Sequence, residues 1–309
     1  MITGSLKGGL GNQLFQIFAI MAYSIRHRVP FVFPHSLVVG VDNRRRTYWD
    51  TLLSGVKHYT NEDGLITDDA LSRFSIYNGA HGYQEIPAGL DAPTSMDGYF
   101  QSWRYFSGEY SRIYEWLDIE GMKRALPRID TGTAPTISVH FRVGDYAHIQ
   151  CYHPVLPVDY YENAIRHIIH RIPDGLNSHI RVFYESGDAE YVVSAVAHIR
   201  GRLPSTLVFS YVDTAIPDWQ QMLMMSQCDH HVIANSTFSW WGAVFSRNTI
   251  GEPNNTDSKV VCYPSAWYGH QLYYIPVADL FPENWTVIDV DESQVNPGCI
   301  CYELLAKNT

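Results

Sequence analysis

The second half of the chain alternates short β-branched runs with longer segments of helical periodicity. Such runs predict strands, and apolar positions that recur every three to four residues predict helices. The predicted strands cover residues 136–142, 180–184, 206–212, 230–234 and 259–263, and the predicted helices cover residues 158–172, 188–200, 217–227 and 236–246. This alternation favours a doubly wound parallel sheet with helices on both faces, where ligands bind at the carboxyl ends of the strands.

The first half of the chain is less regular. A short apolar stretch at residues 2–6, three glycines within four positions and an apolar run at residues 14–25 predict a strand, a tight turn and a buried helix. Residues 104–116 predict a further helix, and the stretch from Pro282 onward predicts no element. We therefore expect an N-terminal domain over residues 1–132 and a C-terminal domain over residues 133–309.

Length and composition are those of a folded protein. The 309 residues suit two domains, and 46% apolar with 17% charged residues is within the globular range. The net charge of −10 argues against general binding to nucleic acid or acidic membrane, so an anionic ligand must be met locally. The chain has neither a signal-peptide pattern nor eighteen successive apolar residues, which predicts a soluble, cytoplasmic protein without a membrane anchor.

The cysteines predict no disulfide framework. Five are present, an odd number, and their spacing matches no zinc site. Reduced thiols are expected, and the pair Cys299 and Cys301 is a weak hint of a metal or redox site.

The most informative segment is HFRVGDY, residues 140–146. Side chains two apart share a face of a strand, so His140 and Arg142 project together, and Gly144 lets the chain turn before Asp145. An arginine at a strand's carboxyl end can form two parallel charge-assisted bonds to a phosphate. The alternative is a local ion pair between Arg142 and Asp145.

A second polar segment follows the predicted strand that ends at Ala234. Asn235, Ser236 and Thr237 supply small polar groups and free amide N–H groups at a helix start, which is an anion site that needs no metal. The alternative is that Ser236 only caps the helix. The two tryptophans at 240 and 241 are expected in the core, because their helix is apolar all round.

Two weaker signals complete the candidates. In GGLGNQLFQ, residues 8–16, glycines allow close approach of a ligand, and Asn12 and Gln13 can hydrogen-bond to sugar or phosphate oxygens. Asp188 follows a strand and opens a helix, so it is either an N-cap or an acceptor for a ribose or a base. Glu185 lies near the same strand end.

Taken in order, four segments resemble the motifs of the family 11 glycosyltransferases, the α-1,2-fucosyltransferases. These segments are residues 8–16, 98–106, 140–146 and 235–243. The resemblance implies a GT-B fold, with two Rossmann-like domains facing a cleft and the C-terminal one holding GDP-fucose. It also implies a donor site formed by Gly9, Gly11, Asn12, Gln13, His140, Arg142, Asp188, Asn235, Ser236, Thr237 and Phe238.

Three positions depart from the pattern of that family. The usual HxRRGDY has Val143 in place of its second arginine, a common SDD sequence has Gly187 in place of its first aspartate, and an aspartate expected to bind guanine is replaced by Gln221. With Val143, one positive charge expected near the diphosphate is missing. Together the three departures affect the recognition of guanine more than the transfer reaction.

The resemblance implies an inverting transfer of L-fucose to the 2-hydroxyl of a galactose in a glycan. Because no DxD-type pair lies in the matching context, we expect that the reaction requires neither a metal nor a cofactor. Arg142, Asn12 and Asp145 are the expected catalytic residues. Besides Asp145, the candidates for the base are Glu185, His148 and His153, and the alternative is a loose transition state that needs no dedicated base. Two alternatives are a transferase that uses another nucleotide sugar and an inactive protein that binds glycans or nucleotide sugars.

Overall fold

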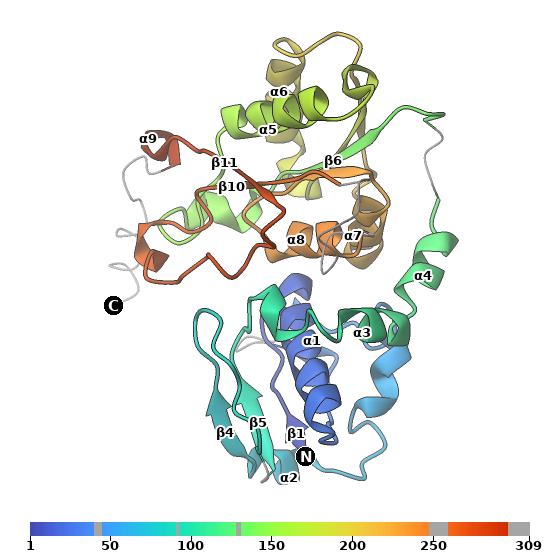
Figure 1. Ribbon diagram of the computed structural model, residues 1–309, viewed down its shortest axis with the longest axis vertical. Helices are drawn as coiled ribbons and strands as arrows, with labels where there is room; N and C mark the ends of the chain where they lie inside the picture. Colours follow the sequence, from blue (N-terminus) through green and yellow to red (C-terminus); the bar gives the residue numbers. More distant parts are fainter. Residues whose placement is uncertain (40–44, 91–92, 128–130, 247–258, 296–309) are drawn as a thin grey trace. The chain divides into compact units, whose positions relative to one another are not determined.

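The structure is a computed structural model that describes residues 1–39, 45–90, 93–127, 131–246 and 259–295. It is composed of two compact units (Figure 1). Cys299 and Cys301, the weak hint of a metal or redox site, lie outside the described residues.

The division of the chain differs in detail from the predicted domains. Unit 1 contains Met1–Ala125 and also Pro276–Pro282, and unit 2 contains Leu126–Ile275 and Glu283–Thr309. The predicted boundary followed residue 132, and the return of a late segment to unit 1 was not predicted. Within unit 1, Ser102 donates to the carbonyl of Asp279 at 2.6 Å, and Arg104 pairs with the Asp279 carboxylate at 2.8 Å. These contacts hold the late segment in place.

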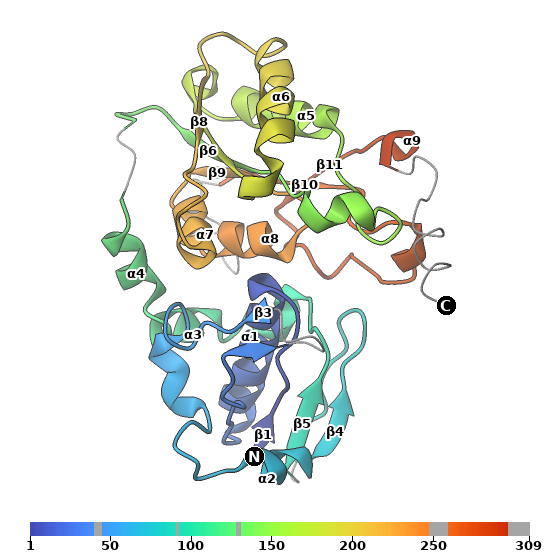
Figure 2. The same ribbon diagram turned by 180° about the vertical axis from the view of Figure 1, so that it is seen from behind.

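Unit 1 is built around a small parallel sheet and one long helix. Its three strands are ordered β1-β5-β4, with bounds Ile2–Thr3, Thr94–Asp97 and Ser75–Asn78. Helix α1, Leu10–His27, is buried from Leu10 to Ser24 except at Asn12, so it forms the core of this unit. Strand, glycine turn and buried helix therefore follow each other as predicted, with the strand shorter than expected (Figure 2).

Shorter elements complete unit 1. They are α2 Asp68–Ser72, α3 Tyr110–Trp116, α4 Ile119–Ala125 and the hairpin strands β2 Val38–Val39 and β3 Arg45–Arg46. The predicted single helix over residues 104–116 is wrong. A 3₁₀ turn at Trp103–Tyr105 and α3 are separated by a break that contains Gly108, where glycine is a poor helix former.

In the described part of unit 2, six parallel strands form one sheet. Their order is β11-β10-β9-β6-β7-β8, with bounds Thr286–Ile288, Val261–Pro264, His230–Val232, Thr136–His140, His179–Phe183 and Val208–Tyr211. Five of these strands were predicted. Strand β11 was not, because it lies in the irregular stretch after Pro282.

Helices cover both faces of this sheet. They are α5 Val158–Arg171, α6 Ala189–Arg200, α7 Asp218–Ser226, α8 Thr237–Val244 and, near the end, α9 Glu292–Val295. Figures 1 and 2 show α5 and α6 on one side of the sheet and α7 and α8 on the other. The predicted α/β class and doubly wound parallel sheet are confirmed.

Side chains of β6 alternate between the two faces of the sheet, so one set packs against α5 and α6 and the other faces α8. Ile137, Val139 and Phe141 pack in one apolar cluster with residues of α5 and α6. Ser138 and His140 point to the opposite face, and the His140 ring lies 5.4 Å from the ring of Phe238 in α8. The sequence therefore directs the polar residues of this strand toward the α8 side.

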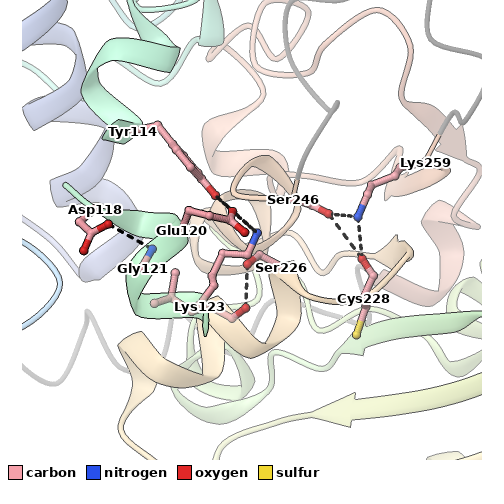
Figure 3. Close-up of polar contacts among 10 residues, drawn as sticks. Tyr114, Asp118, Glu120, Gly121, Lys123, Ser226, Cys228, Ser246 and Lys259 are labelled. Carbon is pink, nitrogen blue, oxygen red and sulfur yellow. Dashed lines mark hydrogen bonds and ion pairs between the residues drawn. The ribbon is translucent and has the colours of Figure 1, made fainter. Parts of the chain in front are cut away.

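One lysine in each unit makes polar contacts with neighbouring segments (Figure 3). In unit 2, Lys259 donates to the carbonyl of Cys228 at 3.0 Å and to the hydroxyl of Ser246. In unit 1, Lys123 lies 3.8 Å from the Glu120 carboxylate, which accepts a 2.9 Å hydrogen bond from Tyr114.

The expectation of reduced thiols is only partly met. Cys228 and Cys262 are free and buried, and burial raises their pKa values to about 11 and about 12. Cys151, in contrast, is disulfide-bonded. A single sequence cannot reveal such a pairing, because it depends on which segments meet in space.

None of the helices in the described ranges is both long enough and apolar enough to cross a bilayer.

Candidate functional site

The strand order of unit 2 marks a position for a site. From β6 the chain proceeds to β7 and β8 on one side, and then returns to place β9 on the other side of β6. The loops after β6 and β9 therefore diverge, and in open α/β sheets ligands bind at this reversal, beyond the carboxyl ends of the strands. The segments that follow these two strands are HFRVGDY and NSTF, both singled out by the sequence.

Arg142 follows β6 and is held by two carboxylates. One terminal nitrogen pairs with Asp145 at 2.5 Å and the other pairs with Glu185, which follows β7. The guanidinium also lies over the ring of Tyr146, 5.0 Å from its centre. Its side chain is 16% exposed, against 48% for Asp145 and 57% for Glu185. The local pair with Asp145 is thus present, yet both carboxylates remain in water.

His140 is the last residue of β6, and its side chain lies on the α8 side of the sheet. It is 5% exposed, and its Nδ1 has no hydrogen-bond partner. Burial, with a smaller contribution from the Arg142 charge, lowers the pKa of His140 to about 3. The His140 ring is therefore neutral at physiological pH and can contribute hydrogen bonds but no charge. The positive charge beside it comes from Arg142.

The turn after Arg142 is fastened to the turn after β7. The backbone N–H of Gly144 donates to both carboxylate oxygens of Asp188, at 2.9 and 3.0 Å. Gly144 has φ +31°, a left-handed conformation that favours glycine. Asp188 opens α6 in the chain, but its side chain makes no cap hydrogen bond. Asp188 thus occupies the N-cap position of α6 without capping it, because its carboxylate binds Gly144 instead.

The NST segment links β9 to α8. Asn235 is buried, and its amide donates to the carbonyls of Pro154 and Trp267 at 2.9 and 3.3 Å, while its Oδ1 has no hydrogen-bond partner. The Ser236 hydroxyl accepts from the N–H of Phe238 at 3.3 Å, as an N-cap does. Thr237 is the first residue of α8. The N-cap interpretation of Ser236 is therefore confirmed, and its role in binding an anion stays a prediction.

Tyr146 connects the two segments. Its hydroxyl donates to the carbonyl of Asn235 at 3.2 Å, and its ring stacks on His153 at 4.9 Å. No role for Tyr146 was predicted from the sequence, although it is the last residue of HFRVGDY. The structure thus brings Arg142 and the NST segment together through a side chain that also lies under the guanidinium.

The remaining candidates belong to unit 1. Gly9 is the N-cap of α1, and Gly11 and Asn12 lie in its first turn. The Asn12 side chain accepts from Gln101 at 2.9 Å, which joins the first motif to the second. Gln13 is buried, and its amide donates to the carbonyls of Gly8 and Arg46 at 3.0 and 2.9 Å. Gln13 therefore shapes the glycine turn, and any role in donor binding stays a prediction.

The three departures lie at different kinds of position. Val143 is half-buried directly after Arg142. A Cβ at Gly187 would meet no atom within 4 Å, so the position has room for the first atom of a side chain. The Gln221 amide donates to the carbonyl of Ile216 at 2.7 Å, in the first turn of α7.

The candidates for a base differ in their surroundings. Asp145 and Glu185 both pair with Arg142, and His148 is exposed. Burial lowers the pKa of His153, against an opposing effect of Asp145, so its ring is neutral and can accept a proton.

Among the described residues, one group of potential metal ligands lies elsewhere, at Asp159, Glu162 and His198 on α5 and α6, where Arg202 pairs with both carboxylates.

Known proteins similar to this chain are glycosyltransferases. The family model described as "Glycosyl transferase family 11" matches residues 82–270. "O-antigen biosynthesis glycosyltransferase WbnK" of Escherichia coli is 33% identical over 141 residues, 44% of this chain and only 40% of that protein. "Alpha-1,2-colitosyltransferase" of the same organism is 22% identical over 94% of this chain and 99% of that protein.

Solved structures resemble the chain more loosely. E. coli ADP-heptose LPS heptosyltransferase II has a TM-score of 0.48 at 10% identity, with 99% of this chain and 97% of that chain covered. POFUT1 in complex with GDP-fucose has a TM-score of 0.42 at 11% identity, with 85% and 97% covered.

The lowered pKa of His140 predicts acid sensitivity. The folded pKa is about 3 against 6.5 in the unfolded chain, so the unfolded state binds more protons between these values and stability falls as the pH falls through this window. For a buried group the loss from pH 6.5 to 5 is about 2 kcal/mol. Thermal unfolding at pH 7 and pH 5 should therefore show a smaller drop for His140→Gln than for the parent. An equal drop in both would contradict the assignment, as would an NMR signal of the His140 ring that titrates near pH 6.5.

Proposed function

Because the chain belongs to glycosyl transferase family 11, we propose that it transfers L-fucose from GDP-fucose to the 2-hydroxyl of a terminal galactose in a glycan. The anomeric carbon is inverted, and no metal takes part. The observation that carries this proposal is the placement of Arg142 at the strand-order reversal of unit 2, beside the start of α8. A guanidinium and a helix start are two groups suited to a diphosphate.

The proposed reaction is a single displacement. The acceptor oxygen attacks the anomeric carbon, the bond from that carbon to the β-phosphate oxygen breaks, and GDP leaves with the bonding electrons. Negative charge grows on the β-phosphate in the transition state, and Arg142 stabilises it. The acceptor proton passes to a base, for which Asp145 is our first candidate because its carboxylate is half in water beside the guanidinium.

A diphosphate can replace the carboxylates that hold Arg142 in the structure described. Ion pairs with exposed partners contribute only about 0–1 kcal/mol, since water solvates the released carboxylate. A phosphate offers the same fork two charge-assisted bonds, each contributing about 1.5–3 kcal/mol. The exchange therefore favours the diphosphate, with Asp145 and Glu185 turning to solvent.

Arg142→Ala is expected to keep the fold and lose transfer. Removing one donor that stabilises growing charge costs about 10²–10³ in rate. Release of GDP from GDP-fucose with a β-galactoside acceptor measures this loss. The matched control is Arg202→Ala, which removes another guanidinium that pairs with two carboxylates, Asp159 and Glu162, away from the site. A rate for Arg142→Ala within a few-fold of the parent would refute the central assignment.

Transfer is expected to continue in EDTA. The charge on the leaving group is assigned to Arg142 and to backbone N–H groups, so chelation of divalent ions should leave the initial rate unchanged. The proposal of a metal-independent reaction fails if the rate is abolished and added Mg²⁺ or Mn²⁺ restores it.

A second candidate is transfer of a different sugar. The relative named alpha-1,2-colitosyltransferase, which matches nearly the whole chain, favours colitose, which is L-fucose without its 3-hydroxyl. The departures at Val143, Gly187 and Gln221 also leave the donor preference open. Initial rates with GDP-fucose and GDP-colitose at equal concentration separate the two. We expect GDP-fucose to react faster, and the reverse order would support the colitosyl alternative. Failure to release GDP from either would favour a binding protein.

A further inference from the structure

The carboxylates around Arg142 differ in burial and in what they bind. Asp145 and Glu185 pair with the guanidinium and are about half exposed. Asp188 is 8% exposed, and both of its oxygens accept from the Gly144 N–H. A buried carboxylate that binds a backbone amide is suited to fixing a turn, because solvent does not compete for it.

The turn at Gly144 has little freedom to adjust. Its φ of +31° is accessible mainly to glycine, and a Cβ there would lie 3.2 Å from Glu185 Oε2. On the strand side, the N–H of Phe141 donates to the carbonyl of Phe183 at 2.9 Å, which continues the pairing of β6 with β7. Arg142 thus lies between two backbone positions that are both bound to the β7 side of unit 2.

We propose that Asp188 is a positioning residue, which sets the direction of Arg142 by holding the amide of Gly144. This inference rests on the proposed function for its effect on catalysis. It assigns Asp188 to the protein's own backbone rather than to the ribose or base of the donor. Recognition of the diphosphate then depends on a carboxylate that never touches it.

The physical reason is that the Arg142 side chain is long, so the position of its guanidinium depends on a fixed backbone. Without the Asp188 bond, the Gly144 N–H loses its acceptor and the turn is free to leave its left-handed conformation. A shift of about 1 Å in a group that binds the transition state can lower a rate by about 10²-fold. Loss of Asp188 should therefore act mainly on kcat and on diphosphate binding.

The experiment compares three variants of the full chain. Asp188→Ala removes the acceptor, and Asp188→Asn keeps one oxygen that can accept from Gly144. The matched control is Asp229→Ala, which removes an exposed carboxylate that accepts from the N–H of Thr136 at 2.8 Å, at the opposite end of β6. Calorimetry gives the dissociation constants of GDP and of inorganic pyrophosphate, and donor turnover gives kcat and KM.

If Asp188 acts through Gly144, Asp188→Ala weakens the binding of GDP and of pyrophosphate by a similar factor of about ten and lowers kcat by about 10²-fold. Asp188→Asn should recover at least tenfold of the lost kcat, and Asp229→Ala should bind both ligands as the parent does. The proposal is overturned if Asp188→Ala weakens GDP but leaves pyrophosphate unchanged, because Asp188 would then contact the nucleoside. Equal losses in Asp188→Asn and Asp188→Ala would overturn it as well.

Hydrogen–deuterium exchange tests the positioning without any ligand. The Gly144 amide should exchange faster in Asp188→Ala than in the parent, in Asp188→Asn and in Asp229→Ala. If the Gly144 amide of Asp188→Ala exchanges at the rate of the parent, the positioning role of Asp188 is refuted even if activity falls. If the parent protein binds neither GDP nor pyrophosphate, the proposed function fails, whereas the exchange result still decides whether Asp188 holds this turn.

Discussion

The site depends on how one guanidinium is fixed at the reversal of strand order in unit 2. Arg142 is held from below by the ring of Tyr146 and from the sides by Asp145 and Glu185, and the backbone two residues later is bound by Asp188. These contacts come from the turns after β6 and β7, which are adjacent strands. Because parallel strands end at the same edge, side chains separated by more than forty residues meet there.

The ionisable groups around Arg142 differ in burial, since Asp145 and Glu185 are exposed whereas Asp188 and His140 are buried. His140 is neutral because burial opposes its protonation, and Val143 occupies the position of a second arginine, so the guanidinium is the cation among three acidic neighbours. Two of these acids are in water, where releasing them costs little. The third is buried and engaged with the backbone. A diphosphate can therefore take over the guanidinium without disturbing the turn that presents it.

The sequence predicted much of unit 2 and less of unit 1. In unit 2 the strands are short apolar runs, and the helices are longer segments that are either amphipathic or, in α8, apolar all round, so period and length identify them. The faces of His140 and Ile137 follow from alternation. In unit 1 the helix predicted over residues 104–116 breaks near Gly108, and segment 276–282 joins from far along the chain. Strand β11 was missed because it lies in the irregular stretch after Pro282.

By itself the sequence determined the α/β class, the order of strands and helices from β6 to β10 in unit 2, the family and the residues at each strand end, since these are local patterns of apolar, polar and glycine residues. Only the tertiary structure decided which of these residues act on one another. The strand order places β9 beside β6, so Tyr146 can form a hydrogen bond with Asn235. The turns after β6 and β7 pack together, so the Asp188 carboxylate accepts from the Gly144 N–H and does not cap α6. The reason is that pairing across a sheet depends on contacts distant in the chain, which local patterns do not encode.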